Sequence, residues 1–147
     1  MDRPAQAHEK LASHSMNCAQ SVLTTFSEEF GMSKDLAMKI ARAFGGGMGQ
    51  SKGICGAVTG AYMVLGLALK PSGDYTKDRA EMGKYMAEFN RRFAALHGSL
   101  NCTDLCGYDL TIPEQGAEAR KNNVFATVCP PLVRDAARIV EDLLQLK

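Results

Sequence analysis

The stretch FGGGMGQSKGICGAVTGAYMVLGL, from Phe44 to Leu67, decides the expected fold of this 147-residue chain. It begins with four glycines in six residues, reaches Cys55, and continues with apolar residues among which glycine and alanine recur. The segment 54–69 is apolar on nearly every side of a helix, which is typical of a helix at the centre of a bundle. Gly56 and Gly60 lie on it, and each interior glycine costs roughly 0.5–1 kcal/mol relative to alanine. The two glycines therefore predict that another helix or a ligand approaches closely.

Helical spacing of apolar residues recurs along the rest of the chain, and no stretch alternates as a strand would. We expect helices over 5–29, 33–44, 54–69, 74–98 and 130–146, and one short helix near 114–121 in a loop-rich stretch 98–128. Ser33 is suited to cap one helix start and Asp74 or Thr76 another, and Gly31 and Gly98 are suited to end helices. The sequence thus predicts an all-α fold over residues 1–147, a single-domain bundle of about five helices with a central glycine- and alanine-rich helix.

Composition and charge narrow the class of protein. The net charge of +1 is too small to favour nucleic acid, and the apolar run 54–69 is shorter than the roughly 20 residues that span a bilayer. The start MDRPAQAHEK lacks the apolar region of a secretory signal, so we expect a cytoplasmic protein without membrane insertion. Five cysteines, an odd number in such a chain, indicate thiols rather than a disulfide framework.

The glycine loop suggests a site around Cys55. Phosphate-binding loops are excluded because neither GxxxxGK[ST] nor GxGxxG fits and no strand precedes the loop. Cys55 is expected in the first turn of a helix, where the positive end of the dipole lowers a thiol pKa. We expect the loop to fold tightly and to bring backbone N–H groups to the Cys55 sulfur. The glycines expected to do so are Gly45, Gly46, Gly47, Gly49 and Gly53.

The other cysteines are less distinctive by themselves. Cys129 stands just before the proline-started last helix, whereas Cys18 is expected inside the first helix, one turn after His14. Cys102 and Cys106 form a CxxxC pair in a segment that reads as a loop. Buried, inert packing is an alternative for each of these thiols. The wide spacings do not match zinc modules, but four thiols that met in space would suit an iron–sulfur cluster or zinc.

Several motifs together resemble one family. The chain contains NCAQSVL at 17–23, FGGGMG at 44–49, CGAVTGAYMVLGL at 55–67 and NCTDLCG at 101–107, followed by a final cysteine at 129. This pattern, over nearly the whole chain, is similar to the C_GCAxxG_C_C family of short bacterial and archaeal proteins, to which a redox role is assigned. The resemblance assigns the family cysteines to Cys18, Cys55, Cys102 and Cys129, and completes the CGAxxG motif with Gly56, Ala57 and Gly60. Cys106 has no counterpart in that pattern.

The resemblance implies thiol redox chemistry, with Cys55 as the activated thiolate and Cys18, Cys102 and Cys129 as resolving thiols. The alternative is an electron-transfer module in which the same four cysteines hold an iron–sulfur cluster or another metal, as a similar domain attached to a multihaem cytochrome suggests. A third reading is a helical interaction protein with inert cysteines. The expected partner is a redox protein or a small thiol or disulfide, and a homo-oligomer is compatible with the sequence. Whether the chain is an enzyme, and which cofactor it uses, stay open at this point.

Overall fold

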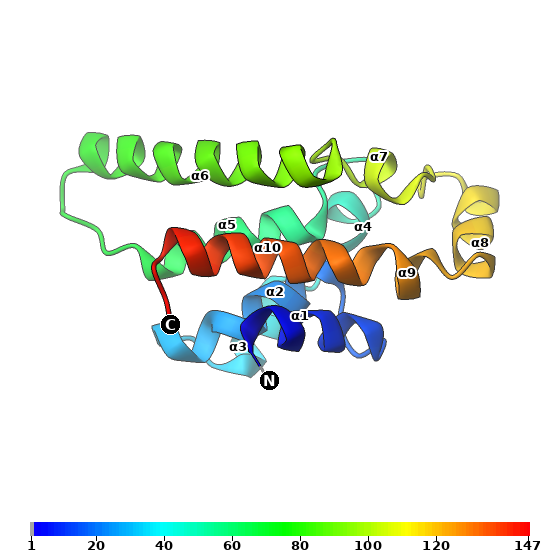
Figure 1. Ribbon diagram of the computed structural model, residues 1–147, viewed down its shortest axis with the longest axis horizontal. Helices are drawn as coiled ribbons and strands as arrows, with labels where there is room; N and C mark the ends of the chain where they lie inside the picture. The colour runs from blue at the N-terminus through cyan, green and yellow to red at the C-terminus, as the bar shows by residue number, and fades with distance from the viewer. Residues whose placement is uncertain (1) are drawn as a thin grey trace.

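The computed structural model describes residues 2–147 and shows that the chain is all-α (Figure 1). Its helices, in chain order, are α1 (Arg3–Ala12), α2 (Cys18–Phe26), the 3-10 helix η1 (Ser27–Phe30), α3 (Lys34–Ile40), α4 (Gly45–Met48), α5 (Gly56–Ala68), α6 (Tyr75–His97), α7 (Cys102–Cys106), α8 (Pro113–Lys121), α9 (Val124–Thr127) and α10 (Cys129–Leu143). Within the described residues the only extended pairing is a single antiparallel bridge between Ile54 and Asn101. The expected count of about five helices was too low, because shorter helices interrupt the stretches between the long ones.

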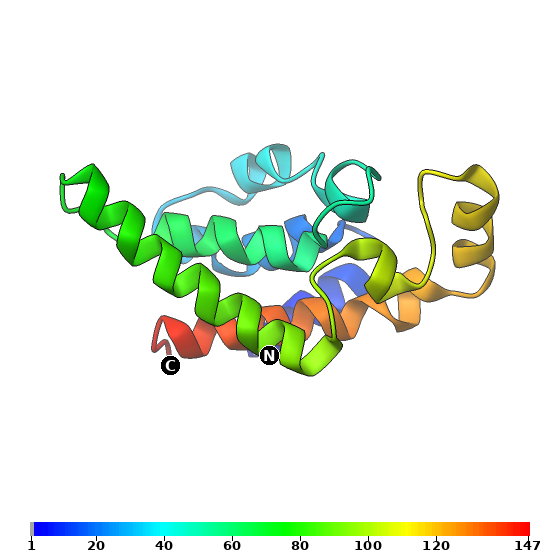
Figure 2. The ribbon, with the colours of Figure 1, turned by 90° about the horizontal axis from the view of Figure 1, so that it is seen from above.

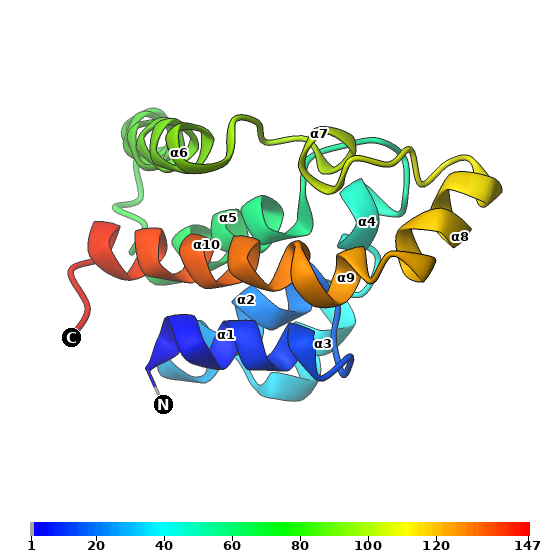
Figure 3. The same ribbon diagram turned by 45° about the vertical axis from the view of Figure 1, so that its right-hand side comes forward.

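The central layer is formed by α5 and α10, which run side by side (Figures 1 and 3). The helix α2 packs most extensively on α5, and α1 on α10. The long helix α6 crosses over α5 and α10 from the other side, as the view from above shows (Figure 2). Buried side chains from all these helices form one apolar core. None of the helices in residues 2–147 combines the length and the apolar character needed to cross a membrane.

The contact between α2 and α5 depends on two glycines. A Cβ atom at Gly60 would lie 2.9 Å from the carbonyl oxygen of Ala19, and one at Gly56 would lie 2.9 Å from the Ala19 nitrogen. The predicted close approach at these glycines is confirmed, and the neighbour is the backbone of α2. Both helices are largely buried, with eight of thirteen residues buried in α5 and seven of nine in α2.

The first predicted helix, 5–29, is in fact two helices and a 3-10 turn. The helix α1 ends at Ala12, and His14 adopts a left-handed φ of 59°. Asn17 then caps α2: its side chain accepts from the Gln20 backbone N–H at 2.8 Å, and the Gln20 side chain accepts from the Asn17 N–H at 2.9 Å. Such a reciprocal capping box favours a new helix start over continuation of the preceding helix. Consequently Cys18 lies in the first turn of α2 and not inside a longer helix.

The remaining helix ends agree better with the sequence. Ser33, Asp74 and Gly98 act as predicted, the first two as N-caps of α3 and α6 and the last as the left-handed residue that ends α6. On α6, Phe93 is fully buried, whereas Leu96, three residues later, is 62% exposed.

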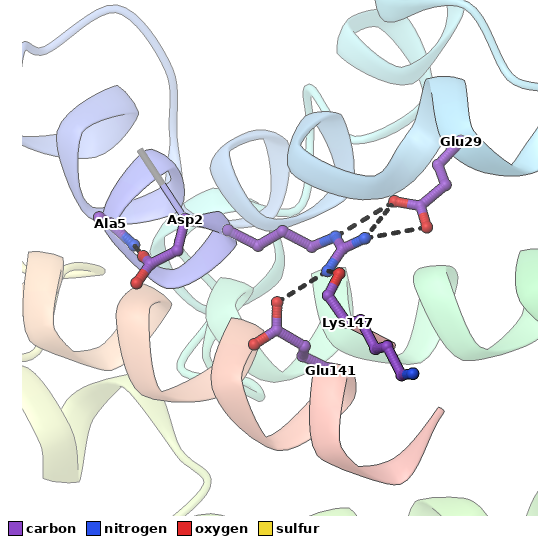
Figure 4. A network of polar contacts seen from close by, with 6 residues as sticks. Asp2, Ala5, Glu29, Glu141 and Lys147 are labelled. Atoms are coloured by element: carbon purple, nitrogen blue, oxygen red, sulfur yellow. Dashed lines mark hydrogen bonds and ion pairs between the residues drawn. The ribbon is translucent and has the colours of Figure 1, made fainter. Parts of the chain in front are cut away.

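One ionic network ties the two ends of the described chain together (Figure 4). The guanidinium of Arg3, on α1, donates to both carboxylate oxygens of Glu29, to Glu141 at 2.9 Å and to the carbonyl oxygen of Lys147 at 3.1 Å. The same guanidinium lies over the ring of Phe26, 5.8 Å from its centroid. The network fixes α1 against η1 and the end of α10, on the opposite side of the core from the cysteines.

Candidate functional site

All five cysteines line one pocket of about 570 Å³. It lies where the first turns of α2, α5 and α10 meet, beside α4 and α7, at one end of the bundle (Figure 1). Cys55, Cys106 and Cys129 are buried, Cys18 and Cys102 are partly exposed, and all five are free thiols. The structure therefore brings together the four cysteines that the family resemblance singled out, and it adds Cys106.

Each of the four family cysteines lies at the start of a helix. Cys55 is the residue that precedes the first turn of α5, and Cys18, Cys102 and Cys129 are the first residues of α2, α7 and α10. Unpaired N–H groups and the helix dipole stabilise negative charge at such positions. At α10 this effect is reduced, because Pro130 and the residue after it are prolines, which carry no backbone N–H.

Backbone pairing places Cys55 beside Cys102. The Cys55 N–H donates to the carbonyl oxygen of Leu100 at 2.8 Å, and the Cys102 N–H donates to that of Gly53 at 3.0 Å, around the bridge between Ile54 and Asn101. The prediction of a loop over Cys102 and Cys106 was wrong, because Asn101 starts the short helix α7 and Gly107, with φ 83°, ends it. Cys55 and Cys102, far apart in sequence, are thus held together by main-chain hydrogen bonds. No local sequence pattern predicts such bonds.

The glycine loop serves a different purpose from the one expected. Gly47 has a left-handed φ of 74°, and a Cβ atom there would lie 2.8 Å from the Cβ of Cys102. At Gly45 a Cβ atom would lie 2.7 Å from the Cβ of Asn17, so the loop closes on the starts of both α7 and α2.

Three N–H groups of the loop are hydrogen-bonded within the loop. Those of Gly49, Ser51 and Gly53 donate to carbonyl oxygens of Gly45 and Gly47. For these three, the expectation that they reach the Cys55 sulfur was wrong. The donors near that sulfur belong to α5 itself.

Neighbouring thiols in the pocket shift the pKa values of Cys18 and Cys55. A hydrogen bond from the Cys18 thiol lowers the pKa of Cys55 against the opposing effect of burial. The backbone N–H groups of Ala57 and Val58 lower that pKa further, although no cap hydrogen bond of ordinary geometry joins them to the sulfur. Hydrogen bonds with Cys129 and Cys55, together with burial, raise the pKa of Cys18 well above its usual value. Of this pair, Cys55 ionises first while Cys18 keeps its proton.

Cys102 and Cys106 form a second pair on α7. Burial raises the pKa of Cys102, and the neighbouring Cys106 and Cys55 sulfurs raise it further. The Cys106 thiol donates to the carbonyl oxygen of Tyr108 at 3.3 Å. A spacing of four residues places two side chains on the same face of a helix. The CxxxC spacing could have identified this pair, had the segment been read as helical.

The cysteines of the pocket are the donors that the implied metal or cluster would use. Four thiols at helix starts are chemically suited to an iron–sulfur cluster or zinc. Among the residues that the structure describes, however, no three His, Cys, Asp or Glu side chains lie close enough together to hold a metal ion.

Comparison with known proteins identifies the family of the chain. The sequence profile of a family described as "Putative redox-active protein (C_GCAxxG_C_C)" matches residues 16–143, a range that includes all five cysteines. A protein of Archaeoglobus fulgidus, described as uncharacterized, is 35% identical over 104 residues, which cover 65% of this chain and 69% of the relative. The search of solved structures found no match. The chain therefore belongs to the C_GCAxxG_C_C family.

Proposed function

We propose that the chain is a dithiol–disulfide redox protein in which Cys55 is the attacking thiolate and Cys18 the resolving thiol. One observation carries the proposal: Cys18 and Cys55 line the same pocket at the first turns of two packed helices, where the Cys18 thiol lowers the pKa of Cys55 while Cys129 and Cys55 raise that of Cys18. Thiol–disulfide exchange requires one thiolate to attack and a second thiol to resolve the mixed disulfide.

The reaction proceeds in two exchanges. The Cys55 thiolate attacks one sulfur of a substrate disulfide, the substrate S–S bond breaks, and one substrate thiolate leaves. Cys18 then loses its proton and attacks the Cys55 sulfur, which releases the second substrate thiolate. The two departing thiolates take up two protons. In total the protein loses two electrons and two protons and gains a Cys18–Cys55 disulfide, while the substrate is reduced to two thiols.

The other two family cysteines extend this chemistry. Cys129 is the largest cause of the raised Cys18 pKa, and Cys102 is close enough to Cys55 and Cys129 for their charges to raise its pKa. Exchange can therefore pass from the Cys18–Cys55 disulfide to the thiols on α10 and α7. In this role Cys129 and Cys102 are further resolving thiols.

A trapping experiment tests the assignment. The reduced protein is treated with a small disulfide, and the products are located by peptide mass spectrometry. Cys18→Ser should accumulate a mixed disulfide on Cys55, and Cys55→Ser should lose the fast reaction. Cys106→Ser, which changes a pocket thiol outside the proposed pair, should still form the Cys18–Cys55 disulfide. A mixed disulfide trapped first on another cysteine would contradict the assignment.

A second candidate function uses the same residues. An electron-transfer module with an iron–sulfur cluster on Cys18, Cys55, Cys102 and Cys129 is favoured by the convergence of all four on one pocket. It requires the thiols to move closer together than they are here. Iron analysis and a visible spectrum of protein purified without oxygen separate the two candidates. Stoichiometric iron with visible absorption would overturn the dithiol proposal.

A further inference from the structure

The lining of the cysteine pocket includes basic side chains and no acidic ones. None of the twenty residues that line it is Asp or Glu, although the chain contains 16 acidic residues. Its charged and titratable lining, apart from the thiols, consists of His14 and Arg42, both exposed at the mouth. Within residues 2–147, the Arg42 side chain has no carboxylate partner among the ion pairs. A cation that is held at a pocket mouth without a counter-ion can bind an anion.

Arg42 is placed there by the same residue that starts α2. The side-chain amide of Asn17 donates to the Arg42 carbonyl oxygen at 3.1 Å and to that of Ala41 at 3.3 Å. Gln20 donates to the carbonyl oxygen of Met38 at 2.9 Å. The end of α3 is thereby fixed against the start of α2, and the main chain of Arg42 is held to Asn17, the residue before Cys18.

A second hollow continues from the first. It shares Gly49, Gln50, Leu110 and Phe125 with the cysteine pocket and extends to Arg120. Arg120 is exposed, has no ion pair in the described part of the chain, and again no acidic residue belongs to the lining. The nearby Asp109 lies outside both linings and is paired with Lys52 at 3.4 Å. The combined cleft therefore has a cation at each end and apolar side chains between them.

The size and burial of the site indicate a small substrate. Cys55 is 3% exposed and Cys129 is 6% exposed, so a disulfide on the surface of a folded partner cannot reach them directly. A pocket of about 570 Å³ is within the range of small-molecule sites. Leu105, Leu110 and Phe125 offer apolar contact to a carbon chain.

We propose that the pocket selects a small organic disulfide whose ends carry negative charge, such as carboxylates, with Arg42 and Arg120 as its binding groups. This inference rests on the proposed dithiol function and supplies its substrate class. The reaction is the dithiol–disulfide exchange of the proposed function: two electrons and two protons pass from Cys55 and Cys18 to the bound disulfide, which leaves as two anionic thiols. The arginines offset the repulsion between the anionic substrate and the Cys55 thiolate.

Three disulfides of similar length test the preference. They end in carboxylate (3,3′-dithiodipropionate), hydroxyl (bis(2-hydroxyethyl) disulfide) and ammonium (cystamine). Each rate of reaction with the folded protein is divided by the rate with the urea-unfolded chain, which removes differences in intrinsic reactivity. We expect the normalised rate of the carboxylate compound to exceed that of cystamine by roughly 10-fold at low salt, and the ratio to fall as salt is added. Equal normalised rates, or a faster reaction of cystamine, would overturn the proposal.

A second measurement does not depend on disulfide exchange. Iodoacetate and iodoacetamide differ mainly in one negative charge, and the modification of each cysteine is quantified by mass spectrometry. We expect the iodoacetate-to-iodoacetamide ratio at Cys55, normalised to the unfolded chain, to be raised about 3-fold or more and to fall in Arg42→Gln. Lys70→Gln is the matched control, because it removes the same charge from an exposed residue beyond the other end of α5.

The two measurements distinguish the possible failures. If no disulfide reacts but the alkylation ratio is raised and depends on Arg42, the anion preference stands and the dithiol function fails. If disulfides react but the ratio is unchanged by both Arg42→Gln and Arg120→Gln, the dithiol function stands and the substrate class is wrong. Because both arginines are exposed, each variant is expected to fold, and thermal unfolding checks this directly.

Discussion

Replacing Gly60 by alanine tests the packing that holds the two proposed redox cysteines together. The new methyl group would lie 2.9 Å from the Ala19 carbonyl oxygen, whereas ordinary contact begins at 3.4 Å. The difference, 3.4 minus 2.9, requires α2 and α5 to separate locally by about half an ångström. Overpacking of this kind costs roughly 1–3 kcal/mol. The gain in helix propensity from glycine to alanine, about 0.5–1 kcal/mol, offsets only part of that cost.

The same helix provides the control. Gly66 also lies within α5, but no atom lies within 4 Å of the position that its Cβ would occupy. Gly66→Ala therefore receives the same propensity gain without the clash and should stabilise the protein slightly. The free energies of unfolding of the two variants, from urea titrations, should differ by about 1–3 kcal/mol, with Gly60→Ala the less stable.

Gly60→Ala should also change the reactivity of Cys55. Separation of α2 from α5 moves Cys18 away from Cys55 and weakens the hydrogen bond that lowers the Cys55 pKa. The pH midpoint of Cys55 alkylation should then rise in Gly60→Ala and stay unchanged in Gly66→Ala. If Gly60→Ala proved as stable as Gly66→Ala, the close contact between the two helices would not have the energetic role assigned to it here.

Three further predictions concern titration and the ionic network. In Cys18→Ala the pH midpoint of Cys55 alkylation should move upward, because the thiol that lowers the Cys55 pKa is gone; a midpoint that stayed in place would contradict this. The Cys102 pKa is raised above its usual value of 9.0, so the folded state keeps a proton that the unfolded chain releases above about pH 9. Stability should therefore fall between pH 8 and pH 10, and Cys102→Ser, measured by urea unfolding at both pH values, should reduce that fall. Arg3→Ala should lower the free energy of unfolding by about 1 kcal/mol, since it removes a part-buried charged hydrogen bond to Glu141 and exposed ones to Glu29, whereas Arg91→Ala, at an exposed pair within one helix, should leave it nearly unchanged.

Local signals in the sequence predicted the helices that have clear ends. Ser33, Asp74 and Gly98 have side chains or conformations suited to helix termini, and each acts there as expected. The break before α2 was missed because the apolar spacing from Leu11 to Cys18 continues across it in register. Only the reciprocal capping of Asn17 by Gln20 marks the break, and such a pair is easily overlooked within a long apolar pattern.

The site could be predicted only in part. The helix start at Cys55 followed from the glycines before it, and the start at Cys129 followed from the prolines after it. The position of Cys102 depends on main-chain hydrogen bonds to residues near Cys55, almost fifty positions earlier, as the interval in the numbering shows. Side-chain types carry no information about such a contact. The place of Arg42 in the pocket lining was missed as well, because it depends on a hydrogen bond from the Asn17 side chain to the Arg42 carbonyl oxygen.

The bridge between Ile54 and Asn101 has a consequence for how the chemistry of this pocket can change. Positions 55 and 102 are held by their own amide N–H groups, and neither hydrogen bond involves a side chain. Any residue except proline can therefore make these two hydrogen bonds, and a side chain small enough for the pocket can replace either thiol. Oxidation, alkylation or replacement of a sulfur alters what the pocket does and leaves its main chain in place. The same scaffold can accordingly accept new reactive groups at these two positions, by mutation or by design, without being refolded around them.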